Sequence, residues 1–154
     1  MRTIEKEKGR LKVNYMANLV ITPGSVKASF GARQVTGVAG VAISAGQALY
    51  LDTDGTYKLA IATTLAQANF KGVALCESVA GQPVVVARRD SDLDLGATLA
   101  VGEAYCVSSS TAGAIAPFSD LGTGDFVSLV GVANASDSIY VTIEPGNHST
   151  VAVS

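Results

Sequence analysis

The chain has 154 residues and a mass of 15.6 kDa, which is the size of one domain with a single core. Hydrophobic residues make up 48% and charged residues 16%, the latter below the roughly 25% of an average globular domain, so the composition argues against disorder. Because the chain has no Trp, few Tyr and Phe, and one His, a hydrolase or an oxidoreductase is also disfavoured.

The chain begins with a basic arm, residues 1–15, which carries five basic and two acidic side chains and therefore a net charge of +3. The total of −2 leaves −5 for residues 16–154, which we expect to form one β-rich domain. The arm has too few apolar residues to fold alone, and we expect it to become ordered on an acidic neighbour. Alternatively, Met16 is the natural start and the arm is an upstream extension. The basic residues of the arm are Arg2, Lys6, Lys8, Arg10 and Lys12.

Neither a secretory signal nor a membrane span is expected. The charges of the arm are not followed by an apolar segment, and no run approaches the roughly 20 apolar residues of a spanning helix. Cys76 and Cys106 lie in apolar stretches, which is typical of reduced core residues in a protein that folds in a cytoplasm; the alternative is one structural disulfide.

From Leu19 onward the chain reads as short strands separated by turn residues, which predicts an all-β fold. Residues 52–55 (DTDG) lie between two such strands and predict a hairpin turn. The same residues resemble the start of a calcium loop, but the glycine comes too early and no bidentate Glu follows. Residues 62–69 form the one predicted helix, of two turns at most.

An internal duplication is the most informative pattern in the chain. Two copies are too few for a solenoid, so we expect two similar β units that close on one core as a small sandwich or barrel. The matching segments are residues 44–51 and 100–107 at an offset of 56, residues 72–75 and 131–134 at an offset of 59, and then residues 82–87 and 138–143.

The core residues follow from this duplication and from the clean alternation of residues 138–143. Residues at matching strand positions are expected to face the same shared core. The predicted core residues are Leu49, Leu51, Tyr105, Val107, Ile139, Val141 and Ile143.

Acidic residues and the single histidine are the candidates for metal binding or catalysis. Asp90, Asp92 and Asp94 alternate with other residues, which is typical of an exposed strand or loop edge, although such a run could also bind calcium. His148 has no identifiable partner, so catalysis by it is not expected. We expect no cofactor and no zinc site.

Arg88 and Arg89 end a predicted strand and could contact an acidic partner, although a solvated strand end is the simpler interpretation. Nucleic-acid binding is disfavoured because the body is acidic and lacks aromatic residues interleaved with basic ones. The glycines lie at turns and form no phosphate-binding pattern.

The chain from Met16 onward resembles the small capsid decoration, or cement, proteins of tailed bacteriophages. The resemblance covers nearly all of residues 16–154 and rests on a pattern of strand, G-Q or G-E, and turn, so it brings no catalytic residues. It implies a β-rich subunit, commonly a homotrimer, that binds the outside of the expanded head and joins major capsid subunits. The motifs that carry it are MANLVITPG, VAISAGQALYLDTDGTYKLA, FKGVALCESVAGQPVVVA and VGEAYCVSSSTAGAIAP.

The composition suits this function, because a weakly charged β module can act by burying surface against copies of itself and against a lattice. A protein of this kind is made in the host cytoplasm and ends on the virion surface. The alternatives are a phage tail or baseplate protein, and a receptor-binding or carbohydrate-binding β module on the virion.

Overall fold

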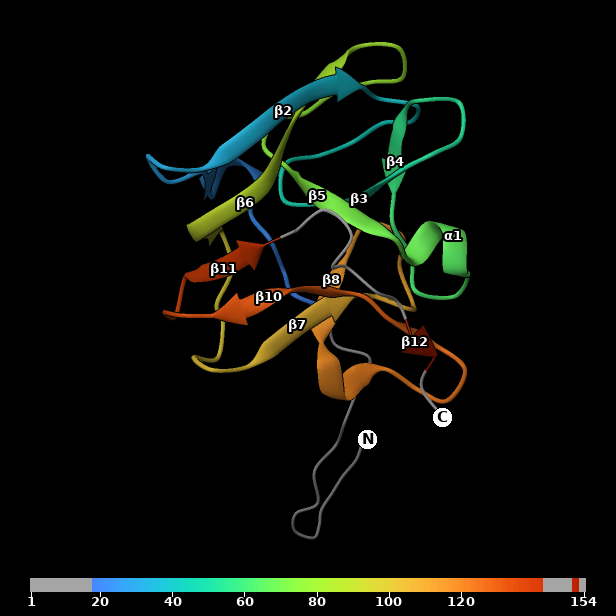
Figure 1. Ribbon diagram of the computed structural model, residues 1–154. Helices are drawn as coiled ribbons and strands as arrows, with labels where there is room; N and C mark the ends of the chain where they lie inside the picture. The colour runs from blue at the N-terminus through green and yellow to red at the C-terminus, as the bar shows by residue number, and fades with distance from the viewer. Residues whose placement is uncertain (1–17, 143–150, 153–154) are drawn as a thin grey trace, which may run out of the picture.

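The computed structural model describes residues 18–142 and 151–152, and it confirms an all-β protein (Figure 1). Ten antiparallel strands form one sheet that curls into a half-barrel. These strands are β1 (Val26–Lys27), β2 (Arg33–Val38), β3 (Ala48–Leu51), β4 (Tyr57–Leu59), β5 (Phe70–Ala74), β6 (Pro83–Leu95), β7 (Ala104–Val107), β8 (Ile115–Pro117), β10 (Leu129–Ala133) and β11 (Ser138–Thr142). A second sheet pairs β9 (Phe126–Val127) with β12 (Val151–Ala152).

Helical structure is brief in the described part of the chain. The helix α1 (Leu65–Ala68) falls inside the predicted range of residues 62–69 but makes only a single turn. Two 3₁₀ turns, Pro23–Ser25 and Phe118–Asp120, complete the helical elements of these residues.

The strand order shows the duplication directly. Along the main sheet the order is β4-β3-β5-β6-β11-β10-β7-β8, so a hairpin lies at each end and one further strand separates each hairpin from the central β6–β11 pair. The first unit, residues 33–87, lies in the upper part of Figure 1, and the second unit, residues 89–142, lies in the lower part. β6 belongs to both units, because residues 83–89 pair with β2 while residues 89–94 pair with β11.

The glycines at the start of the two copies have the same geometry. Gly46 and Gly102 have φ angles of 92° and 85°, a region that favours glycine, and their positions differ by the predicted offset of 56. Each N–H donates a 2.8 Å hydrogen bond to a carbonyl of the matching strand, from Gly46 to Ala74 and from Gly102 to Ala133. The second offset, from Ala74 to Ala133, is 59, so both predicted offsets are confirmed.

The last strand of each unit matches at a different offset from the expected one. Ala74 lies opposite Val86, and Ala133 lies opposite Ile139, so Val86 matches Ile139 at an offset of 53. The predicted match of residues 82–87 with residues 138–143 has an offset of 56. The reason is the length of the turn: twelve positions separate Ala74 from Val86, but six separate Ala133 from Ile139.

Two apolar clusters fill the half-barrel. The smaller one lies inside the first unit and contains Ala39, Ile43, Leu49, Tyr57, Ala74, Val84 and Val86. The larger one packs the other face of the first unit against the second unit, and it includes Tyr50, Phe70, Val73, Leu93, Tyr105, Val107, Ile115, Ile139 and Val141.

Five of the predicted core residues are buried: Leu49, Tyr105, Val107, Ile139 and Val141. The prediction for Leu51 is wrong, because this residue ends β3 where the hairpin reaches the surface, and its side chain is 46% exposed. The expectation of one shared core is also corrected, since Leu49 lies in the smaller cluster. Ile143 lies outside the described residues.

The hairpin between β3 and β4 is a polar turn, as predicted. The Lys58 ammonium lies 2.6 Å from the Asp52 carboxylate and 3.5 Å from that of Asp54. The hydrogen bond from Lys58 holds the pKa of Asp52 below its ordinary value. The Asp54 carboxylate accepts hydrogen bonds from the N–H and hydroxyl of Thr56. Asp52 and Asp54 therefore stabilise the turn through these contacts.

Candidate interaction surfaces

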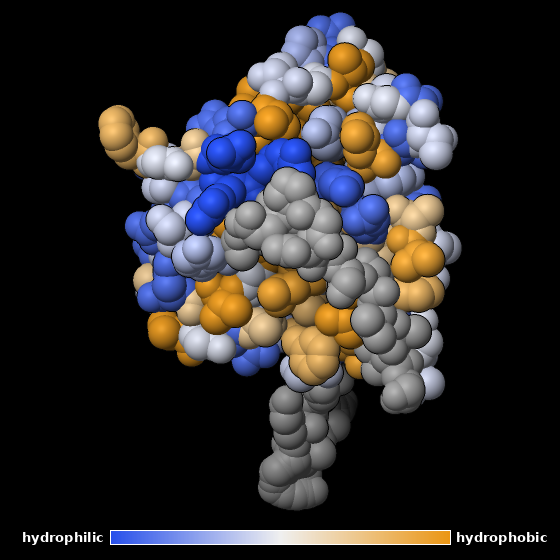
Figure 2. Space-filling model, viewed as in Figure 1, coloured by the Kyte–Doolittle hydropathy of each residue, from blue (hydrophilic) through white to orange (hydrophobic). Residues whose placement is uncertain are grey.

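An arginine cluster, Arg33, Arg88 and Arg89, lies where β2 pairs with β6. Arg33 and Arg89 are exposed and directly opposite each other in register. Two positive side chains in opposite positions of neighbouring strands concentrate positive charge at this point of the sheet. Figure 2 shows strongly hydrophilic side chains on the surface over β6.

Arg88 gives the cluster an unsatisfied donor. Its Nε atom is buried and has no hydrogen-bond partner among the described residues. A guanidinium group binds a carboxylate with two parallel hydrogen bonds, but this buried Nε is not open to a partner, so the exposed Arg33 and Arg89 are the arginines that can bind one. Sequence reasoning selected Arg88 and Arg89 but missed Arg33, which the β2–β6 register places beside them. The predicted contact residues of the arm, Arg2, Lys6, Lys8, Arg10 and Lys12, lie outside the described residues.

An apolar outer face lies on β10 and β11. Leu129, Val132 and Tyr140 are 42%, 41% and 40% exposed. They line a hollow of about 320 Å³ together with Val130, Gly131, Ala133 and Asn134, so no charged side chain lines it. Figure 2 shows apolar side chains on the surface over β10 and β7. Exposed apolar patches of this kind mark contact sites between proteins.

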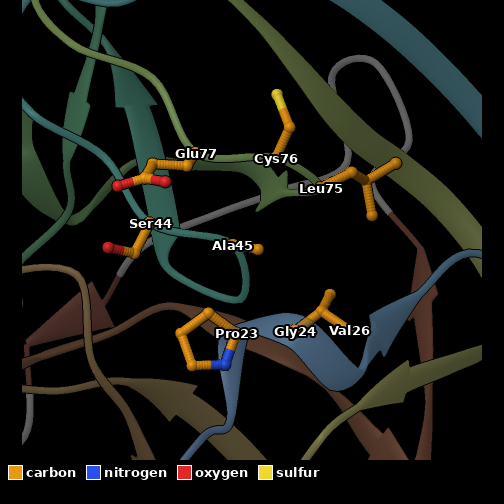
Figure 3. Close-up of a pocket in the computed structure, with 8 residues that line it drawn as sticks. All are labelled: Pro23, Gly24, Val26, Ser44, Ala45, Leu75, Cys76 and Glu77. Atoms are coloured by element: carbon orange, nitrogen blue, oxygen red, sulfur yellow. The ribbon is translucent and has the colours of Figure 1, made fainter.

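A larger hollow, of about 540 Å³, lies between the segment Pro23–Val26 and the end of β5 (Figure 3). Its polar side chains are Ser44, Cys76 and Glu77. The Cys76 side chain points away from Pro23 and Gly24, and its sulfur accepts a 3.4 Å hydrogen bond from the Val85 N–H. These groups do not converge on one point, so the geometry supports no reaction centre in this hollow.

Both cysteines have free thiols, and their surroundings differ. Cys106 is fully buried, as predicted for a core residue, whereas Cys76 is half-buried against the smaller apolar cluster. Burial raises the pKa of the Cys106 thiol to about 11, and the Glu103 carboxylate adds to the shift. Since the thiolate is the reactive form, Cys106 is chemically protected in the folded protein.

We predict that iodoacetamide at pH 8 alkylates Cys76 and leaves Cys106 unmodified in the native protein. A thiol with a pKa of about 11 is ionised to only about 0.1% at this pH. Peptide mass spectrometry measures both sites, and the guanidinium-unfolded protein, in which both cysteines should react, is the control. Equal modification of the two cysteines in the native protein would contradict the burial of Cys106.

The run of acidic residues has a structural use. Asp90 is buried, in contrast to the expected exposed edge, and its carboxylate accepts hydrogen bonds from the Ser29 N–H at 2.8 Å, the Ser29 hydroxyl and the Asp92 N–H at 3.0 Å. Asp94 accepts a 2.9 Å hydrogen bond from the Gly96 N–H. Within the described residues, no three His, Cys, Asp or Glu side chains are grouped as metal ligands would be. The run therefore ties β6 to the neighbouring loops.

The remaining expectations concern membranes and His148. Among the residues that the structure describes, no helix has the length and apolarity to cross a membrane. His148 lies outside these residues. Comparison with known protein families, with curated proteins and with solved structures finds no match to this chain. The resemblance to phage decoration proteins therefore stays a prediction.

Proposed function

We propose that this chain is a structural virion protein that decorates the outside of an expanded phage head and joins neighbouring major capsid subunits. It is made in the host cytoplasm, assembles as a homotrimer and acts by binding, without catalysis. The observation that carries the proposal is the presence of two surfaces suited to protein contact on one β domain: the arginine cluster and the apolar outer face.

The two surfaces suit different partners. The arginine cluster matches carboxylates of a capsid subunit, because Arg33 and Arg89 are both exposed and face each other. The apolar outer face matches another weakly charged surface. A trimer repeats each capsid contact three times, so modest contacts add up to firm attachment.

The proposal is tested by mixing the purified chain with expanded heads that lack it and measuring bound copies relative to the major capsid protein. We expect near-stoichiometric binding to the heads. A variant that lacks residues 2–15 should fold but bind more weakly, with the larger difference at low salt, because salt screens the contacts of a basic arm.

Other results would contradict parts of the proposal. A few copies per particle would indicate a tail or baseplate protein, and binding to host cells or carbohydrate in place of heads would indicate an adhesin. Unchanged head binding by the deletion variant would show that the arm is dispensable and would favour Met16 as the functional start.

A further inference from the structure

The apolar outer face of the second unit has a counterpart in the first unit that is completely buried. The strand registers define the matching positions, since Val73 lies opposite Ala87 in the first unit and Val132 lies opposite Tyr140 in the second. In each of three matching pairs, the residue of the first unit is 0% exposed, whereas the residue of the second unit is 40% to 42% exposed. The pairs are Phe70 and Leu129, Val73 and Val132, and Ala87 and Tyr140.

The second unit covers the face of the first one. Phe70 and Val73 belong to the larger apolar cluster, where residues of the second unit such as Tyr105 and Ile115 complete the packing. Backbone hydrogen bonds join the two units beside this contact, from the Ala62 N–H to the Ser108 carbonyl at 2.9 Å and from the Phe126 N–H to the Ala62 carbonyl at 2.8 Å. Within one chain, this face therefore serves as a contact between β units.

We propose that the outer face of β10 and β11 is the contact surface for a second copy of this chain. The face keeps apolar side chains at three positions whose counterparts are fully buried, and two of these counterparts, Phe70 and Val73, are covered by another β unit of the same protein. Its hollow of about 320 Å³ has no charged residue in its lining, so two copies can meet there without burying an unpaired charge. Tyr140 supplies an aromatic side chain, the type enriched at the centres of protein interfaces.

The inference rests on the self-assembly part of the proposed function and adds the surface through which it occurs. If the copies form a closed ring of three, this face meets a different surface of the next copy, whereas a two-fold dimer pairs the face with itself. In both arrangements Val132 lies inside the contact, so one substitution addresses both.

The test is the molar mass of the full-length protein in solution, measured by light scattering after gel filtration over a concentration series. We expect an assembly for the wild type and the mass of a monomer, 15.6 kDa, for Val132→Lys, because a lysine would bring unpaired charge into an apolar contact. Tyr140→Lys is a second variant with the same expected result. Val38→Lys is the matched control, since this strand valine is 46% exposed in the first unit, and it should keep the wild-type mass.

The outcomes separate this inference from the proposed function. Circular dichroism must show a folded protein for at least one of the two β10–β11 variants, and assembly that persists in a folded variant overturns the inference. A wild type that is monomeric throughout, but loses head binding on Val132→Lys, also overturns it and identifies the face as a capsid contact. A variant that still assembles but no longer binds heads would overturn only the proposed contact between copies, and the decoration function would stand.

Discussion

Alanine at Gly131 is expected to lower the free energy of unfolding by at least about 2 kcal/mol. A Cβ atom at this position would collide with the Tyr140 carbonyl oxygen and would lie 2.9 Å from its carbonyl carbon. Because Gly131 lies in β10 beside β11, the collision is with backbone that a side-chain rotation does not relieve. Gly72 occupies the matching position in the first unit, where a Cβ would lie 2.7 Å from the Ala87 carbonyl oxygen, so Gly72→Ala should be similarly destabilising.

Urea denaturation followed by circular dichroism measures this effect. Gly31→Ala is the matched control, because a Cβ at Gly31 meets no atom within 4 Å, and its stability should change by no more than about 0.5 kcal/mol. A Gly131→Ala variant as stable as Gly31→Ala would contradict the close approach of β10 and β11.

Replacement of Ile139 by alanine is the second change with a large expected effect, a loss of about 2 to 5 kcal/mol. The Ile139 side chain is 0% exposed in the larger cluster, and its residue lies between Ala133 of β10 and Leu93 of β6. Removing its outer carbon atoms therefore leaves a cavity at the centre of the sheet and loses the transfer energy of those atoms.

The same denaturation measurement applies to Ile139→Ala. Val20→Ala is the control, since Val20 is 87% exposed and should cost little. A loss below about 0.5 kcal/mol for Ile139→Ala would be the cost of a surface substitution and would contradict the burial of this side chain.

The features that the sequence predicted correctly depend on local signals. The turn at residues 52–55 and the alternation that buries Ile139 and Val141 involve residues close together in the chain. The duplication was visible because Gly46 and Gly102 each need a positive φ at the start of a strand. An all-β fold with one short helix follows from these signals.

The features that the sequence did not predict depend on distant pairing. Arg33 joins Arg89 only through the register of β2 with β6, which lie far apart in the chain. Alternation places Tyr140 and Ile139 on opposite faces of the sheet. Ala87, which matches Tyr140 in the first unit, is nevertheless buried. Burial of that face therefore depends on which unit covers it. Leu51 fits the core pattern, yet it lies at a strand end that reaches the surface.

The sharing of β6 between the two units makes the duplicated halves inseparable. Its first part pairs with β2 and β5, and its last part pairs with β1 and β11. A cut within this strand would leave each fragment with an open edge of unpaired backbone groups, which is prone to aggregate. We therefore expect the chain to melt in one cooperative transition and neither half to fold without the other, although each carries its own copy of the strand pattern.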